Sequence, residues 1–322
     1  MLRFALRRVL WTIPTLFVVV TLTFLLMRSI GGSPLRHGPF LGLSRVAWVK
    51  YGDWQPQSIE ANIKRKYGLD RPWYDQYADY LKGVATLDLG PSLTFRNRTV
   101  NDLVREQAPV TLELGGLACL WALLIGVPVG VLCAVRAGSA FDTGARVVSS
   151  LGVAAPAFLV GTMLIYLVSL RAGLLPTSGW GESWTQMLLP SLTLALLPMA
   201  WIVRLLRGSM LETLSADYVQ AAAAKGLRRQ RVVLVHVLRN AALPVLTAAA
   251  PLLGFLITGS FIVEEVFAIP GIGRYYIAAA GARDYPVLLG LTVVLTIVIV
   301  FANLVVDLVH AALDPRVRDA TV

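Results

Sequence analysis

Hydrophobic residues gather in six long runs that are separated by polar segments. The runs fall at about 9–28, 109–135, 147–170, 187–206, 241–263 and 287–311. Each holds roughly 20 residues or more, the length that an α-helix needs to cross about 30 Å of hydrocarbon. The runs lack the period-two alternation of a barrel strand, and a helix satisfies its own backbone polar groups within lipid. The pattern therefore predicts an all-α membrane protein with six transmembrane helices.

The first run resembles a secretory signal at its start, because Arg3, Arg7 and Arg8 precede it. Its apolar part, Val9 to Met27, is longer than the roughly 7–15 residues of a signal sequence, and no A-x-A cleavage pattern follows. We therefore expect a retained first helix.

The basic residues are unevenly distributed between the segments that join the runs. Hydrophobic residues make up 56% of the chain, charged residues make up 15%, and the net charge is +10. If the amino terminus is cytoplasmic, most cations of the short segments lie inside, and the two short outer loops hold only Arg171, Arg274 and Arg283. The inner cations are Arg3, Arg7, Arg8, Arg136, Arg146, Arg204, Arg207, Lys225, Arg228, Arg229, Arg231, Arg239, Arg316 and Arg318. This asymmetry follows the positive-inside rule, so it predicts a multi-pass protein with both termini in the cytoplasm, and it does not indicate nucleic-acid binding.

The expected organisation is one membrane domain with an outer insertion. Residues 1–29 form an amino-terminal tail and the first helix, and residues 30–108 form an extracytoplasmic segment. Its many aromatic residues fit either a cap at the membrane surface or a docking surface or lid. Residues 109–311 form the core domain with a cytoplasmic loop at 208–240, and residues 312–322 form a cytoplasmic tail.

Motifs for catalysis or metal binding are absent from the sequence. There is no G-x-x-x-x-G-K-[ST], H-E-x-x-H, C-x-x-C or G-x-S-x-G pattern, and His37, His236 and His310 are far apart. Cys119 and Cys133 lie in one run, roughly 21 Å apart along a helix, which is too far for a disulfide. We expect no catalytic residue, no metal site and no cofactor bound by this chain.

Ionisable residues are nearly absent from the centres of the runs. Glu113, Arg204, Asp307 and His310 lie near the ends, which weakens the case for an ion-coupled carrier. Helix breakers are frequent, and two interpretations of them stay open, namely close helix contact or helices that rock between two arrangements. They are Pro128, Pro156, Pro198 and Pro251, with Gly126 and Gly130 in small-xxx-small spacing.

The stretch from Asp217 to Pro244 combines a short alanine helix, a glycine and a basic amphipathic segment. Asp217 is predicted to cap the helix, with Gln220 as its capping-box partner. Gly226 stands where a left-handed residue ends a helix, after Lys225. Two interpretations remain, namely a surface helix held by anionic headgroups or a thin helix that enters a groove on another protein.

This stretch resembles the EAA loop of bacterial ABC importer permeases, in the form of the dipeptide, oligopeptide, nickel and glutathione group. That pattern reads roughly DYV-x-x-A-x-A-KGL and then H-x-LRNA-x-LP, and it is present here from Asp217 to Leu227 and from His236 to Pro244. Further stretches recur in the family's order along nearly the whole chain. They include 67–84, APVTLEL at 108–114, GLLPTSGWG at 173–181, VEEVFAIPGIGR at 263–274, RDYP at 283–286 and VDLVHAALDPR at 306–316.

The resemblance implies the ABC importer permease fold and a transport mechanism. A homologous second permease chain completes the pathway, and two ABC ATPase subunits bind ATP and Mg²⁺ beneath it. An extracytoplasmic binding protein delivers di- or oligopeptides. The loop's short helix would dock on an ATPase and couple it to the pathway. The residues so assigned are Asp217, Tyr218, Gln220, Ala221, Ala222, Ala224, Lys225, Gly226 and Leu227.

Two features depart from the general pattern. Gln220 stands where the general motif has Glu, so coupling through a salt bridge from this position is in doubt. The segment from about Arg36 to Gln55 is longer than is usual for the family. The same machinery serving nickel or glutathione stays open, as do an ion-coupled secondary transporter and a lipid-binding membrane scaffold.

Overall fold

The computed structural model describes residues 2–29, 70–95 and 97–313, and this part of the chain is helical with one isolated antiparallel bridge between Pro91 and Thr99. The chain forms two compact units. The first comprises residues 1–8, 110–273 and 299–322, and the second comprises residues 9–109 and 274–298. The long 36–55 stretch lies outside the described residues.

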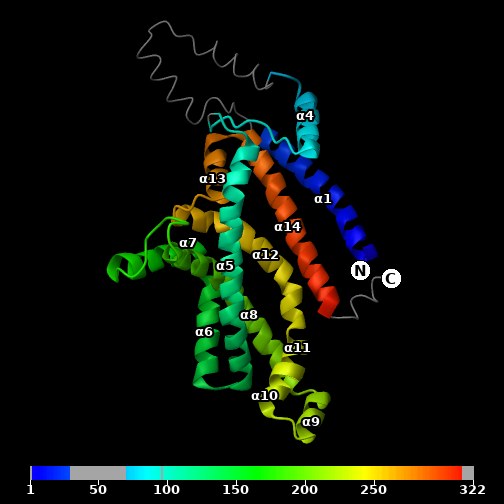
Figure 1. Cartoon of the computed structure of the whole chain (residues 1–322), viewed down its shortest axis with the longest axis vertical. Coiled ribbons are helices and arrows are strands. Elements are labelled where there is room, and N and C mark those ends of the chain that lie inside the picture. Colours follow the sequence, from blue (N-terminus) through cyan, green and yellow to red (C-terminus); the bar gives the residue numbers. More distant parts are fainter. Residues whose placement is uncertain (1, 30–69, 96, 314–322) are drawn as a thin grey trace. The chain divides into compact units, whose positions relative to one another are not determined.

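The helices follow the predicted runs closely, except at the third run (Figure 1). Helix α1 spans Leu2–Ser29, α4 Trp73–Thr86, α5 Val100–Val135, α6 Ala140–Ala154, α7 Ala157–Leu164 and the π-helix η2 Ile165–Arg171. Helix α8 spans Trp184–Leu214, α9 Asp217–Ala224, α10 Arg229–Arg231, the π-helix η3 Val232–Val237 and α11 Leu238–Ala241. Helix α12 spans Leu243–Val266, α13 Ile272–Ala282 and α14 Tyr285–Leu313.

The described residues contain four helices that are long and apolar enough to cross a membrane, or up to six if each of two bent pairs counts as one span. The four are Leu10–Ser29, Val100–Val135, Trp184–Leu214 and Tyr285–Val309. The bent pairs are Ala140–Ala154 with Ala157–Arg171 and Arg229–Ala241 with Leu243–Ala249. The count of six spans stays a prediction.

The third predicted run is not one straight helix. Its two parts, α6 and α7–η2, meet at a bend of 110°. Ala155 is extended, with φ −79° and ψ 126°, because the ring of the following Pro156 disfavours the helical region for the residue before it. Pro156 then caps α7, and its carbonyl accepts hydrogen bonds from the backbone N–H groups of Leu159 and Val160.

Helices α5 and α8 approach closely in the first unit because glycines line their contact. A Cβ placed on Gly126 would lie 3.2 Å from Cβ of Ile202, and one on Gly130 would lie 3.2 Å from Cβ of Leu206. The Gly126–Gly130 spacing therefore acts in helix contact, one of the two open interpretations. The core beside it contains Leu114, Ala118, Ala122, Leu189, Leu194, Ala195, Ile202, Leu256, Val263, Phe267 and Ile269.

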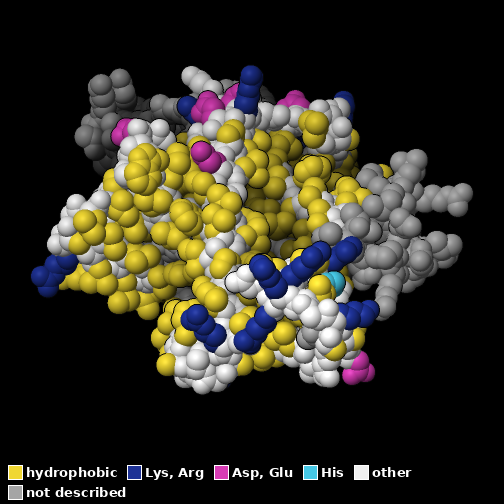
Figure 2. Space-filling model, turned by 60° about the horizontal axis from the view of Figure 1, so that its bottom comes forward, with side chains coloured by type: hydrophobic (Ala, Val, Ile, Leu, Met, Phe, Trp, Pro, Cys, Tyr) yellow, Lys and Arg dark blue, Asp and Glu magenta, His cyan; other side chains and the backbone are white. Residues whose placement is uncertain are grey.

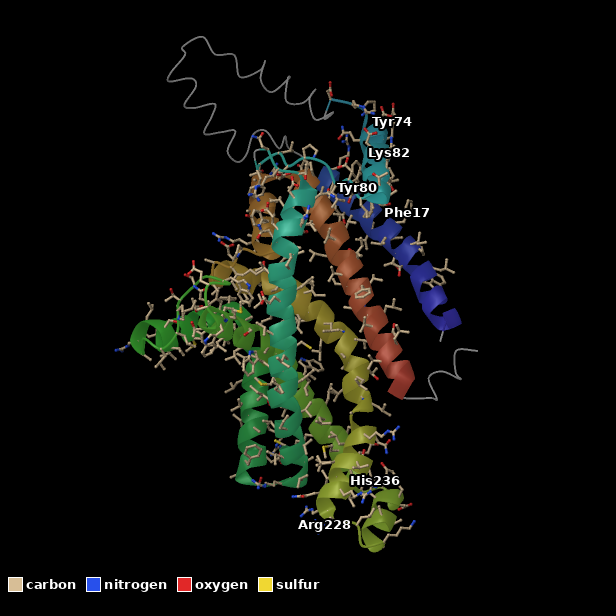
Figure 3. All side chains as sticks on the ribbon, viewed as in Figure 1. Phe17, Tyr74, Tyr80, Lys82, Arg228 and His236 are labelled. Carbon is tan, nitrogen blue, oxygen red and sulfur yellow. The ribbon has the colours of Figure 1, made fainter. Side chains whose placement is uncertain are left out.

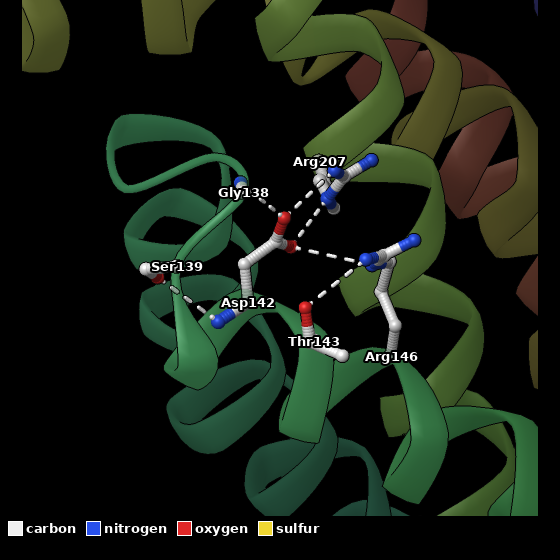
Figure 4. A network of polar contacts seen from close by, with 6 residues as sticks. All are labelled: Gly138, Ser139, Asp142, Thr143, Arg146 and Arg207. Atoms are coloured by element: carbon white, nitrogen blue, oxygen red, sulfur yellow. Dashed lines mark hydrogen bonds and ion pairs between the residues drawn. The ribbon is translucent and has the colours of Figure 1, made fainter.

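A buried ion pair ties the turn between α5 and α6 to α8 (Figure 4). Nε of Arg207 donates to Asp142 Oδ1 at 2.6 Å, and the second guanidinium nitrogen donates to Oδ2 at 2.8 Å. The backbone N–H of Gly138 donates to the same carboxylate at 3.0 Å, and Oγ of Ser139 accepts from the Asp142 N–H as the α6 cap. Arg146 is a further cation, 3.7 Å from Oδ1. The side chain of Asp142 is fully buried, so this network fixes where α6 begins against α8.

The segment predicted as the last outer loop is largely helical. Glu264 belongs to the end of α12 and is fully buried, and residues 272–282 form α13. Thr111 Oγ1 donates to Glu264 Oε1 at 2.9 Å, and the Gly273 N–H donates to Oε2 at 2.7 Å. The N–H of Ile272 donates to Thr111 Oγ1 at 2.9 Å, so the first turn of α13 is held against α5 and α12.

In the second unit, α4 packs on α1 through aromatic side chains (Figure 3). Phe24 contacts Tyr77 and Tyr80, with ring centroids 5.2 and 6.0 Å apart, and Thr21 Oγ1 lies 2.6 Å from the Tyr77 hydroxyl. The Tyr80 hydroxyl donates to the Leu289 carbonyl at 3.2 Å, and burial together with nearby Tyr77 raises the pKa of Tyr80. Trp73 and Tyr74 stay exposed at the start of α4.

A further buried carboxylate, that of Asp284, holds the loop that precedes α5. Asp284 Oδ2 accepts from Ser92 Oγ at 2.6 Å and from the N–H groups of Leu93 at 3.0 Å and Thr94 at 2.8 Å. Its other oxygen accepts from the Val287 N–H in the first turn of α14. Asp284 therefore links the turn at Ser92–Thr94 to the first turn of α14.

Candidate coupling segment

The segment from Ser215 to Ala242 joins α8 to α12 and contains all the site residues that the sequence predicts; we call it the coupling segment. It consists of α9, a sharp turn at Gly226, and a second arm made of α10, η3 and α11 (Figure 1). Figure 3 labels Arg228, the residue before this arm, and His236 on it.

Helix α9 begins one residue earlier than a cap at Asp217 would require. The Ala216 carbonyl accepts from the N–H groups of Val219 and Gln220, so Ala216 occupies the cap position and Asp217 is the first helical residue. Gln220 Nε2 donates to the Ser215 carbonyl at 3.3 Å. The predicted capping box is therefore wrong, because Gln220 is three residues from Asp217 but four from the actual cap. The Asp217 carboxylate still lies in the first turn, where the helix dipole favours it.

Gly226 has the left-handed backbone that the sequence predicts, with φ +80°. The Lys225 N–H donates to the Ala221 carbonyl and closes the last turn of α9, and extended Arg228 then leads into α10. No atom lies within 4 Å of a Cβ built on Gly226. Backbone conformation, and not lack of space, is what requires glycine here.

Most of the predicted residues face outward from α9. Asp217, Tyr218, Gln220, Ala221, Ala224, Lys225 and Gly226 are exposed, and Ala222 and Leu227 are half-buried. Apart from Asp217, Tyr218 and Gln220, the exposed residues of α9 carry only small side chains. This geometry fits a thin helix that enters a groove on a partner.

The inner face of the coupling segment is anchored by aliphatic residues that are not among the predicted site residues. Val219 is 5% exposed, and Val232, Val233 and Val237 of η3 are buried with it. They share one apolar cluster with Ala134 of α5, Leu206 and Met210 of α8, and Ala241. Val219 could have been found from its spacing, since positions 219 and 222 lie one helical turn apart on one face.

A hydrogen bond joins the two arms. Asn240 Nδ2 donates to the Tyr218 hydroxyl at 2.7 Å and to the His236 carbonyl at 3.3 Å. Tyr218 belongs to the DYV stretch and Asn240 to the LRNA stretch. Asn240 was not predicted as a site residue, although its motif was recognised.

A cavity of about 390 Å³ lies behind α9, within the first unit. Its lining is mostly aliphatic and consists of Val135, Leu214, Val219, Leu227, Arg229, Val232 and Val233. Helix α9 is thus attached on one side by Val219 and by Tyr218, with unfilled space beside that attachment. Among the described residues, no group of three or more His, Cys, Asp or Glu side chains is placed to hold a metal ion.

Residues 126–319 match the family model described as the binding-protein-dependent transport system inner membrane component. The chain belongs to this family. The matched region contains the coupling segment and helices α6 to α14.

Full-length relatives extend the similarity beyond the matched region. The oligopeptide transport system permease protein OppB of Haemophilus influenzae is 37% identical over 319 residues, covering 99% of this chain and 100% of the relative. The dipeptide transport system permease protein DppB of Bacillus subtilis is 37% identical over 318 residues, covering 99% and 98%. OppB of Salmonella typhimurium is 38% identical over 319 residues, covering 99% and 100%.

A solved structure shares the fold. A chain of the inward-facing MetNI methionine ABC transporter superposes with a TM-score of 0.54 at 20% identity, covering 66% of this chain and 96% of that chain. The fold is therefore that of an ABC importer permease, as the sequence predicts.

Proposed function

We propose that this chain is the membrane-spanning permease subunit of an ATP-driven importer that takes di- or oligopeptides from an external binding protein into the cytoplasm. The observation that carries the proposal is full-length similarity to proteins named as oligopeptide and dipeptide permeases. It is supported by the exposed helix α9, which lies in the stretch that resembles the family's EAA loop. The chain itself is non-catalytic. ATP and Mg²⁺ bind on two ATPase subunits, and a homologous second permease completes the pathway.

Coupling in this proposal begins at the exposed face of α9. Ala221 and Ala224 are exposed and nearly flat, so they allow close approach of an ATPase cleft. When the ATPases close on ATP, they move α9 as a rigid body between its Ala216 cap and Gly226. Gln220 carries no charge, so shape and position, more than a salt bridge, hold α9 in the cleft.

Displacement of α9 then reaches the membrane helices through two attachments. Val219 lies in the apolar cluster with the ends of α5 and α8. Tyr218 is hydrogen-bonded to Asn240, three residues before α12 begins at Leu243. The short second arm, Arg229–Ala241, meets the first residues of α12 at a 41° bend, which is a natural hinge for this motion.

The proposed topology places both termini and the coupling segment in the cytoplasm, with residues 30–108 outside the cytoplasmic membrane of a bacterium. The basic residues of the coupling segment support this orientation through the positive-inside rule. The domain boundaries at 29, 108 and 311 rest on the same hydropathy pattern.

The deciding experiment is affinity purification of the full chain from its native membranes with its partners. We expect a second permease, two ATPase subunits or domains, and an external binding protein that binds peptides more tightly than nickel or glutathione. A binding protein selective for nickel or glutathione would keep the machinery but overturn the peptide substrate. Substrate uptake by the purified chain alone in liposomes, driven by an ion gradient, would overturn the importer mechanism.

A further inference from the structure

The second arm of the coupling segment, Arg229–Ala241, has two unlike faces. One face is buried, with Val232, Val233, Val237 and Ala241 exposed by 7% or less. The other face leaves Leu234 and Val235 exposed by 58% and 53%. Leu234 and Val235 therefore form an exposed aliphatic pair on an arm whose other valines are buried.

Arginines flank the exposed pair. Arg231 lies three and four positions before Leu234 and Val235, Arg239 lies four positions after Val235, and Arg228 precedes the arm. All three are exposed, and none takes part in the ion pairs found within the described part of the chain. The arm contains no acidic residue. Figure 2 shows Lys and Arg side chains gathered among hydrophobic ones on the face of the molecule turned toward the viewer.

The contacts of the buried face show where the arm lies along the transmembrane helices α5 and α8. Its valines share a cluster with Ala134, one residue from the end of α5, and with Leu206 and Met210 near the end of α8. Leu132, on the same last turns of α5, is 40% exposed, so the apolar surface of the spans extends to this level. The arm then continues into α12 through its 41° bend. Leu234 and Val235 therefore lie level with the last apolar turns of two spans.

We propose that this face is a binding site for anionic glycerophospholipids of the inner leaflet. The phosphates accept hydrogen bonds from Arg228, Arg231 and Arg239 and are attracted by their positive charge. Leu234 and Val235 contact the first methylenes of the acyl chains. Guanidinium groups suit phosphate because their planar fork donates two parallel hydrogen bonds. An amphipathic helix with basic and apolar residues at this depth has the composition of an interfacial lipid site.

The lipid site is separate from the ATPase contact proposed for α9. The exposed face of α9 is alanine-rich and contains no lysine or arginine, whereas the arginines lie at Arg228 and on the arm. The site goes beyond the proposed transport function and stands even if the transported substrate is not a peptide. A lipid bound at the hinge before α12 would make transporter activity depend on membrane charge.

The test is native mass spectrometry of the intact detergent-purified complex, titrated with phosphatidylglycerol or with phosphatidylcholine. The wild type is expected to retain phosphatidylglycerol at least about tenfold better than phosphatidylcholine. The triple variant R228Q/R231Q/R239Q is expected to lose most of this preference, and L234S/V235S to weaken retention of both lipids. The matched control R136Q/R171Q/R204Q removes the same charge from exposed arginines elsewhere and is expected to keep the preference.

Two results would overturn the proposal. One is equal retention of the two lipids by the wild type. The other is a triple variant that keeps the lipid preference but loses its ATPase subunits, which would assign the arginines to the ATPase instead. Since the complex is weighed with its subunits, failure to assemble is distinguished from failure to bind lipid.

Discussion

Asn240 donates a 2.7 Å hydrogen bond to the hydroxyl of Tyr218, 22 positions earlier in the chain. The bond joins the two arms of the coupling segment, because Tyr218 lies on α9 and Asn240 lies on α11, three residues before α12. It explains why the two short motifs on either side of Gly226 act together, because each supplies one partner of this hydrogen bond.

Replacing Tyr218 with Phe removes this hydrogen bond and keeps the ring. We expect the free energy that holds the two arms together to fall by about 0.5–1.5 kcal/mol, the typical net contribution of one hydrogen bond. In the reconstituted transporter, more ATP should be hydrolysed per substrate transported, with assembly unchanged. Asn240→Ala should have the same effect, and the double variant should be no worse than either single one. Fully additive losses would show that the two residues act independently.

Replacing Gly226 with Val should uncouple ATP hydrolysis from uptake and leave membrane insertion intact. The native φ of +80° costs an L-residue about 1–2 kcal/mol and a β-branched one more, so the turn must rearrange and misplace α9. Substrate-stimulated ATPase activity measures the effect. Gly226→Asn is the control, because Asn tolerates the left-handed region and should retain most coupling. Normal uptake by the Val variant would contradict the assigned role.

The α5–α8 contact predicts a stability difference between two glycines of one helix. Gly130→Val places a side chain against Leu206 and should destabilise the fold by about 1–3 kcal/mol, the usual cost of overpacking. Gly116→Val carries the same change in helix propensity, but no atom lies within 4 Å of its Cβ. Thermal unfolding in detergent, followed by size-exclusion fluorescence, should show a clearly lower midpoint for the variant at 130 alone. Equal midpoints would mean that the helices do not approach here.

Replacing Asp142 with Asn should loosen the turn between α5 and α6. The substitution removes the charge that balances Arg207 and weakens a carboxylate that also accepts from Gly138. Hydrogen exchange over residues 138–146 should speed up, and the thermal midpoint should fall. Asp79→Asn breaks an ion pair with Arg71 whose side chains are 60% and 49% exposed, so it should change almost nothing. Similar effects of the two substitutions would contradict the claim that buried Asp142 stabilises the turn between α5 and α6.

Asp284→Asn tests the anchor of the loop before α5. One charged oxygen accepts from Ser92, Leu93 and Thr94, and hydrogen bonds to charged groups contribute about 1.5–3 kcal/mol each. Exchange of the Leu93 and Thr94 amides should rise by roughly tenfold or more, since 1.4 kcal/mol corresponds to a factor of ten. Asp88→Asn is the control, because Asp88 is exposed and accepts only a 3.3 Å bond from Gly90 within the described part of the chain. Unchanged protection at Leu93 would contradict the anchor.

Helix positions were largely predictable from apolar runs, but a run does not reveal its own bends. The run at 147–170 has enough apolar residues for a span, yet Ala155 and Pro156 turn its halves through 110°. Hydropathy sums over a window and does not register which residue breaks the backbone hydrogen bonds. The pattern predicts a loop at 264–286 for a related reason, since Pro and Gly residues interrupt the apolar run there. In the structure this segment contains the buried end of α12 and helix α13.

The candidate site was predictable where backbone chemistry is local. Gly226 adopts the left-handed conformation that its place after Lys225 indicates, and the alanines of α9 form a helix. The capping box failed because it requires an exact register, and α9 begins at the Ala216 cap. Val219 and Asn240 were missed as site residues because their roles depend on partners brought close by folding.

The sequence by itself indicated that this chain lies in a membrane, roughly where its apolar helices fall, and to which family it belongs. Hydropathy, charge asymmetry and the order of motifs can all be read from the amino-acid sequence. Only the tertiary structure decided which residues distant in sequence meet, in the coupling segment and elsewhere in the fold. Buried Asp142 meets Arg207 from 65 positions away, Glu264 meets Thr111 from 153 positions away, and Asn240 reaches Tyr218 across a turn. A buried carboxylate is stable only with its donors in place, and those donors come from helices that are distant in sequence.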